Sequence, residues 1–171
     1  MPARPNRPLA RLILSLVASL VLGGINAFLA LPQIPAWLDM LQRPAFLPPD
    51  PDIVPVILFV YLLLGVILFL LWQASRVDRQ DKALCLALVG FTLILMGLWG
   101  YLFFGLRSPF MGVMISVFVI AILIAAMVQA LKVSFGATML LFPVVIIIFL
   151  AAYANYVIVQ LNQSLPIFGF S

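Results

Sequence analysis

Residues 53–72 read IVPVILFVYLLLGVILFLLW, and no side chain in this stretch is charged. Crossing the ~30 Å hydrocarbon core of a bilayer takes about 20 apolar residues in a helix. A strand of a membrane barrel is about half as long and alternates apolar with polar residues. Because the stretch is long and apolar on every face, it predicts a transmembrane helix.

Four further stretches share this length and this lack of internal charge; they cover residues 12–31, 83–105, 110–131 and 137–161. The links between the stretches are short except at residues 32–52, and short links make sequential helices antiparallel neighbours. The sequence therefore predicts an all-α membrane protein, a five-transmembrane-helix bundle that forms a single transmembrane domain over residues 1–171.

The composition is that of a chain whose solvent is lipid. Hydrophobic residues make up 66% of the 171 residues and charged residues 8%, whereas a soluble domain is about 45–50% apolar and about 25% charged. The net charge of +4 does not indicate nucleic-acid binding, because the bases lie at the ends of apolar stretches and form no contiguous patch. We expect the lipid bilayer as the surroundings and no nucleic acid as a partner.

The distribution of basic residues predicts an orientation. Seven of the nine lie on one side of the expected helices, namely Arg4, Arg7, Arg11, Arg76, Arg79, Lys82 and Lys132, and two lie on the other side, Arg43 and Arg107. Loops rich in Lys and Arg stay in the cytoplasm. We therefore expect a multi-pass protein with a cytoplasmic N-terminus, and with the loop of residues 32–52 and the C-terminus on the opposite side.

The side chains needed for acid–base or metal chemistry are scarce. The chain has no His and no Glu, and its five Asp lie in loops or at the ends of apolar stretches. A metal site needs clustered His, Cys or carboxylate ligands, and a proton-coupled pump carries ionisable groups within its spans. We therefore expect no catalytic residues, no metal site and no enzymatic activity.

The first apolar stretch has a small residue at every fourth position, namely Ser15, Ser19, Gly23 and Ala27. Such a stripe lets two helices approach closely, which favours a retained helix over a cleaved secretory signal. Polar amides also lie within two stretches, at Asn26 and Asn155. Each either bonds to a neighbouring helix or contacts a ligand, and the sequence leaves both readings open.

The loop of residues 32–52 contains six prolines, at positions 32, 35, 44, 48, 49 and 51. Since proline fixes φ, this long connection is also stiff. It could lie across the mouth of the bundle as a lid, or rest at the membrane surface with Trp37 in the aromatic belt. At its end, Asp50 is expected to cap the following helix, with Pro51 at the first helical position.

An ordered set of residues runs through positions 35–162. In the first half it comprises Trp37, Leu41, Arg43, Pro44, Pro48, Pro49, Pro55, Val56, Tyr61, Gly65 and Trp72. In the second half it comprises Leu98, Trp99, Leu102, Phe103, Phe104, Gly105, Leu140, Leu141, Phe142, Pro143, Ala151, Ala152, Asn155, Leu161 and Asn162. The set resembles the TspO/MBR family of translocator and tryptophan-rich sensory proteins.

This resemblance implies a five-helix bundle, often a homodimer, that binds a tetrapyrrole, a sterol or another apolar ligand as a carrier or sensor. The pocket would lie beneath the first loop. Matched positions give the implied ligand-binding residues: Trp37, Arg43, Pro44, Pro48 and Pro49 in the loop, Tyr61 and Asn155 lining or supporting the pocket, and Trp99 and Phe103 on the third helix.

Among the positions that depart from the family pattern, three lack an aromatic side chain. Ile57, Val144 and Ile147 stand where the family usually has aromatic residues. Aromatic faces stack on planar ligands, and aliphatic side chains do not provide that geometry. The alternative function is therefore a non-catalytic accessory subunit of a larger membrane complex, in contact with partner chains, lipids or pigments.

Overall fold

The computed structural model describes residues 8–163, and within them five helices are long and apolar enough to cross a membrane. These are α1 (Pro8–Ala30), α3 (Asp50–Gln73), α4 (Arg79–Gly100) with its continuation η2 (Tyr101–Gly105), α5 (Pro109–Ala130) and α6 (Phe135–Leu161). No strand occurs in the described part of the chain. The predicted five-helix architecture is confirmed.

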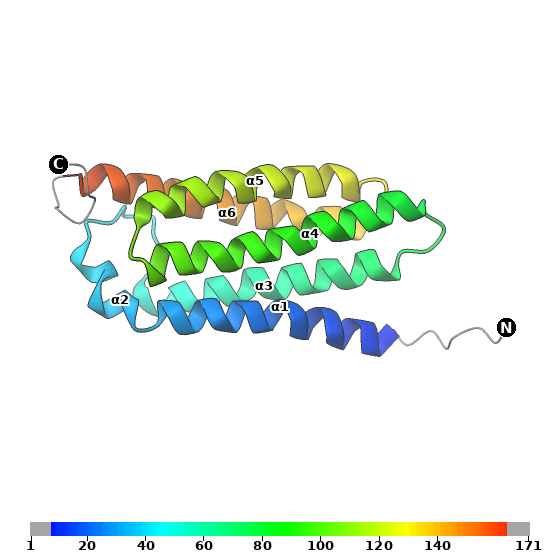
Figure 1. Ribbon diagram of the computed structural model, residues 1–171, viewed down its shortest axis with the longest axis horizontal. Coiled ribbons are helices and arrows are strands. Elements are labelled where there is room, and N and C mark those ends of the chain that lie inside the picture. The colour runs from blue at the N-terminus through cyan, green and yellow to red at the C-terminus, as the bar shows by residue number, and fades with distance from the viewer. Residues whose placement is uncertain (1–7, 164–171) are drawn as a thin grey trace.

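The long helices lie side by side along the longest axis of the molecule (Figure 1). Helix α1 packs on α3, α4 packs on α5, and α6 packs on both α5 and α3. The start of α1 and the α3–α4 turn lie at one end of the bundle, and the Pro-rich loop and the end of α6 lie at the other. This loop also contains two short elements that the sequence analysis did not predict, α2 (Gln33–Ala36) and the 3-10 turn η1 (Leu38–Met40).

Side-chain caps fix where three of the helices begin. The carboxylate of Asp78 accepts hydrogen bonds from the backbone N–H groups of the first turn of α4. The hydroxyl groups of Ser108 and Ser134 accept from the third residue of α5 and α6, both at 3.3 Å. Caps of this kind satisfy N–H groups that have no partner within the helix.

The predicted cap of the second long helix is wrong. Helix α3 begins at Asp50 itself, the preceding residue is Pro49, and no side chain caps the first turn. The Asp50 carboxylate instead forms an ion pair with Arg43, which also pairs with Asp39 at 2.9 Å. The cation that binds Asp50 lies seven residues earlier in the chain, outside the short range over which a capping pattern can be recognised.

The predicted small-residue stripe of α1 is the face that packs on α3. All four of its residues are buried. A Cβ added to Gly23 would lie 2.8 Å from Cγ of Tyr61, and the Ser19 hydroxyl donates to the carbonyl oxygen of Tyr61 at 2.5 Å. The two backbones therefore approach more closely than larger side chains would allow.

Asn26 joins three helices in the middle of the bundle. Its Nδ2 donates to the hydroxyl oxygen of Tyr61 on α3 at 2.6 Å and to the carbonyl oxygen of Met96 on α4 at 2.9 Å. The amide also packs against Gly100 of α4, where a Cβ would overlap it. Asn26 therefore bonds to neighbouring helices, which is one of the two roles that the sequence left open for it.

Candidate binding pocket

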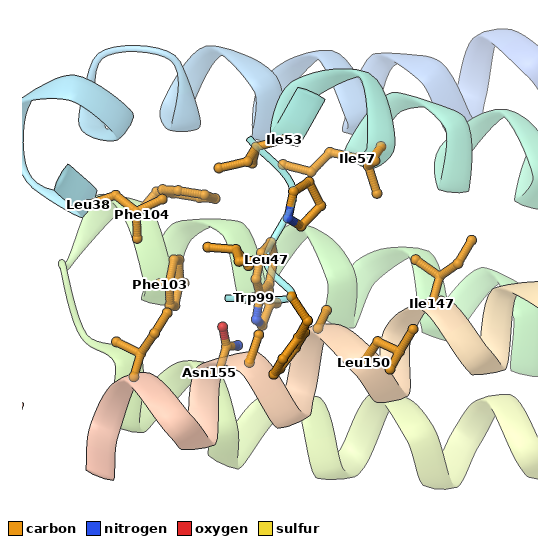
Figure 2. Close-up of a pocket in the computed structure, with 16 residues that line it drawn as sticks. Leu38, Leu47, Ile53, Ile57, Trp99, Phe103, Phe104, Ile147, Leu150 and Asn155 are labelled. Atoms are coloured by element: carbon orange, nitrogen blue, oxygen red, sulfur yellow. The ribbon is translucent and has the colours of Figure 1, made fainter. Parts of the chain in front are cut away.

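A pocket of about 290 Å³ lies at the loop end of the bundle (Figure 2). Its walls come from α3, from the end of α4 with η2, and from α6, and the Pro-rich loop covers it. The lining residues are Leu38, Phe46, Leu47, Pro48, Ile53, Val56, Ile57, Trp99, Phe103, Phe104, Ile147, Leu150, Ala151, Ala154, Asn155 and Ile158. Nearly all of these side chains are apolar, as in most small-molecule sites.

The local geometry of η2 brings two neighbouring phenylalanines to this site. Residues Tyr101–Gly105 form a π-helical turn, in which the N–H of Leu106 donates to the carbonyl oxygen of Tyr101 at 2.9 Å. Such turns are rare within α-helices and are frequent at functional sites. Here both Phe103 and Phe104 are buried and line the pocket.

Aromatic rings form one side of the pocket. The ring of Trp99 is stacked on Phe103, with centroids 5.3 Å apart and planes at 9°, and Phe104 meets both rings edge-on. Trp37 lies behind Phe103, with centroids 5.4 Å apart. Because Trp37 is only 3% exposed, it does not lie in an aromatic belt at the membrane surface.

Two polar groups of the pocket have no partner in the described part of the chain. The indole Nε1 of Trp99 and the amide Nδ2 of Asn155 are buried and make no hydrogen bond within residues 8–163. Both side chains project from the pocket wall in Figure 2. A buried donor without an acceptor costs about 1–3 kcal/mol, so an acceptor atom of a ligand that reached either nitrogen after a small side-chain shift would recover this free energy.

The loop is held over the pocket at two places. Phe46 stacks on Tyr153 of α6, with ring centroids 5.4 Å apart. The Asn162 side chain, at the end of α6, accepts from the N–H of Gln42 and donates to its carbonyl oxygen, both at 2.9 Å. These contacts join the loop to the end of α6, which lies more than 100 residues further along the chain.

A smaller cavity of about 70 Å³ lies deeper in the bundle. Tyr61, Asn26 and Ser116 are among its lining residues, and it shares Ile57 and Trp99 with the larger pocket. The two hollows are therefore neighbours, separated by side chains that belong to both.

The predicted site residues fall into four groups. Pro48, Trp99, Phe103 and Asn155 line the main pocket, Tyr61 lines the smaller cavity, and Trp37 supports Phe103 from behind. Arg43, Pro44, Pro49 and again Pro48 line a separate surface hollow of about 490 Å³ in the loop. The structure therefore brings the aromatic and amide residues together and leaves the cationic part of the loop outside the main pocket.

Most of the pocket wall is aliphatic and was not predicted. Ile53, Leu150 and Ile158 line it, but nothing distinguishes them in the sequence from apolar residues that face lipid. The signal that was available is the spacing of Ala151, Ala154 and Asn155, three small or polar residues on one side of α6. No group of three His, Cys, Asp or Glu that could hold a metal ion occurs among residues 8–163.

The fold and the pocket together define a class of protein, a five-helix membrane bundle with an apolar pocket beneath a loop. The model of the TspO/MBR family matches residues 14–161 of the chain. The chain belongs to the TspO/MBR family, as the order of its residues predicted.

Two relatives extend this finding. The chain is 29% identical over 155 residues to the Tryptophan-rich protein TspO of Archaeoglobus fulgidus, an alignment that covers 89% of this chain and 97% of the relative. It is 28% identical over 136 residues to the Tryptophan-rich protein TspO of Chlorobaculum tepidum, covering 77% and 83%. The similarity therefore extends over nearly the whole length of both proteins.

Proposed function

We propose that this protein binds an apolar small molecule that carries a hydrogen-bond acceptor, and acts as a membrane carrier or sensor for it. The observation that supports the proposal is the pocket of about 290 Å³, whose apolar walls contain two buried N–H donors without acceptors. Sites of this kind bind through apolar contact and orient the ligand with a few polar groups.

The shape of the walls narrows the proposed ligand. Trp99 offers a flat face at one side, whereas Ile57 and Ile147 form aliphatic walls. A ligand with one planar part and one aliphatic part fits this combination better than a wide planar ring system. A tetrapyrrole would have to use the Trp99 face alone, and a sterol would use the aliphatic walls.

The first test is replacement of Asn155. In the purified full-length chain, titrated with a porphyrin and separately with a sterol, Asn155→Leu is expected to weaken binding about five- to tenfold, since one hydrogen bond is worth about 1 kcal/mol. The readout is the Kd from quenching of tryptophan fluorescence. Thermal unfolding of the variant should stay close to that of the wild type.

Tyr156→Phe is the matched control, because Tyr156 is the next residue of α6 and is half exposed. It should leave both affinity and stability unchanged. If Asn155→Leu aggregates while the surviving protein binds normally, Asn155 is a structural residue. If neither probe binds the wild-type chain saturably, the proposal fails for both ligand classes.

We also propose that the loop end of the bundle faces away from the cytoplasm. Arg11, Arg79 and Lys132 lie at the opposite end, while Arg107 lies at the loop end, where its Nε donates to Gln33 at 2.9 Å. Two of the bases that support this orientation, at positions 4 and 7, lie outside the described residues. The support is the excess of basic residues at one end.

A cysteine scan tests this orientation, because the single native thiol, Cys85, is buried. Met40 is 71% exposed in the loop, and Ser75 is exposed in the α3–α4 turn. With a membrane-impermeant maleimide added to intact cells, Met40→Cys should react and Ser75→Cys should react only after permeabilisation. The reverse pattern would contradict the proposed orientation.

An accessory role in a membrane complex is the second proposal, and the aliphatic side chains at Ile57 and Ile147 favour it. Because these two side chains are aliphatic, the pocket wall has fewer aromatic faces on which a planar ligand could stack. Gentle solubilisation separates the two functions. A stoichiometric partner chain would support the accessory role, and an extractable small molecule would support the carrier or sensor.

A further inference from the structure

Four basic side chains gather at the end of the bundle opposite the pocket. Arg11 lies in the first turn of α1, Arg76 and Arg79 lie at the α3–α4 turn, and Lys82 lies in the first turn of α4. Among residues 8–163 none of the four is within ion-pair distance of a carboxylate. This end of the molecule therefore carries positive charge that the described chain does not neutralise.

Two of these side chains meet at the C-terminal end of α3. The guanidinium of Arg11 lies 5.8 Å from the centroid of the Trp72 ring, and its Nη1 donates to Gln73 at 3.3 Å. The Nζ of Lys82 donates to the carbonyl oxygens of Trp72 and Ala74, both at 2.7 Å. Cations are favourable beside the last carbonyls of a helix, but two of them side by side also repel each other.

The carboxylates nearest in the sequence have other partners. Asp78 caps the first turn of α4. Asp81 accepts from Gln129 at 2.7 Å and pairs with Lys132 at 3.6 Å. Because a guanidinium has five N–H donors and an ammonium has three, most donors of Arg11 remain available after the bonds described above.

Burial separates the two converging cations from the others. Arg11 and Lys82 are half-buried, whereas Arg76 and Arg79 are exposed. The ring of Trp72 is 39% exposed at the same place, so the cations have an apolar surface beside them. A charged group next to an apolar wall, at the end of membrane-spanning helices, lies at the level of lipid headgroups.

We propose that Arg11 and Lys82 bind the phosphate group of an anionic phospholipid, with the acyl chains resting against Trp72. A planar guanidinium can donate two parallel hydrogen bonds to a phosphate, and basic pockets between membrane helices bind anionic headgroups. A lipid is favoured over a soluble phosphate because Trp72 supplies an apolar contact that a free anion cannot use. This site goes beyond the proposed function and does not depend on the pocket.

Trp72 makes the site measurable. Trp37 and Trp99 lie at the other end of the bundle, so a lipid that quenches fluorescence near this end reports mainly on Trp72. The full-length chain is reconstituted in nanodiscs that contain phosphatidylcholine and phosphatidylglycerol, with bromine on the acyl chains of only one lipid at a time. Brominated phosphatidylglycerol is expected to quench more strongly than equally brominated phosphatidylcholine.

The double variant Arg11→Gln/Lys82→Gln should abolish this preference. Each basic contact is worth about a fivefold change in lipid affinity. Arg76→Gln/Arg79→Gln is the matched control, because it also removes two charges from the same end, at exposed positions, and it should keep the preference. The single variant Lys82→Gln should weaken the preference for phosphatidylglycerol. Lys82→Arg keeps the positive charge and should retain the preference. For each variant, quenching by brominated phosphatidylglycerol is compared with quenching by brominated phosphatidylcholine. A change in the stability of the protein affects both values equally and does not alter their ratio.

Three outcomes would overturn the proposal. The preference could survive in Arg11→Gln/Lys82→Gln, or it could fall equally in Arg76→Gln/Arg79→Gln, which would indicate diffuse attraction to the membrane surface. Inorganic phosphate could also remove the preference at equal ionic strength, which would assign the site to a soluble anion. Binding of a porphyrin or sterol in the pocket is measured on the same samples, and its success or failure leaves these results unaffected.

Discussion

Replacing Gly100 by alanine is expected to destabilise the bundle by about 3 kcal/mol or more. The added Cβ would overlap the Asn26 amide, so that side chain must turn away. It would then lose its bonds to Tyr61 and Met96. Overpacking costs about 1–3 kcal/mol, and each buried polar group left without a partner costs about 1–3 kcal/mol more.

Gly97→Ala is the matched control for this experiment. Gly97 lies on the same helix, three residues before Gly100, and nothing lies within 4 Å of an added Cβ there. Its effect should stay within about 0.5 kcal/mol. Thermal and denaturant unfolding of both variants in the same detergent measure the difference. Equal destabilisation by the two alanines would show that the contact with Asn26 does not carry the effect.

Replacing Asn162 by alanine is expected to release the Pro-rich loop from α6. The side chain is 1% exposed and bonds both backbone groups of Gln42, as well as the carbonyl oxygen of Ile158 at 2.7 Å. Losing two or three buried hydrogen bonds costs about 2–3 kcal/mol. The open population of the loop should therefore rise about 30-fold or more.

Amide hydrogen exchange of residues 38–48 measures this opening, and the dissociation rate of a bound porphyrin or sterol measures its effect on the pocket. Exchange of the loop should become faster in Asn162→Ala while exchange in α3 and α5 stays unchanged. Gln163→Ala is the control, because within residues 8–163 the Gln163 side chain bonds only to Gln160, at an exposed place. Unchanged loop exchange in Asn162→Ala would show that the stack of Phe46 on Tyr153 suffices to hold the loop.

The number and position of the long helices could be predicted because a bilayer imposes a simple requirement. Each span must be apolar over about 20 residues, and residues 53–72 meet this requirement without reference to any other part of the chain. The small-residue stripe on α1 was likewise readable, since its period alone defines a face. Its partner could not be read, because Gly65 and Tyr61 on α3 carry no periodic signal of their own.

The candidate site was less accessible to prediction. The pairing of Asn162 with Gln42 spans 120 residues of sequence, and no local pattern marks it. The π-helical turn at Tyr101–Gly105 was also missed, because hydrophobic periodicity does not distinguish it from the end of an α-helix. The resemblance to the TspO/MBR family did point to Trp99, Phe103 and Asn155, whose positions at the pocket only the three-dimensional arrangement could reveal.

One wall residue of the pocket has a consequence for how binding must be measured. Leu150 lines the pocket and is nevertheless 50% exposed. Pocket and hydrocarbon thus share a boundary at this point, and a lipophilic compound dissolved in the bilayer reaches the site at its membrane concentration. Dissociation constants expressed per volume of water should then rise in proportion to the amount of lipid added, whereas those expressed as mole fraction in the bilayer should stay constant.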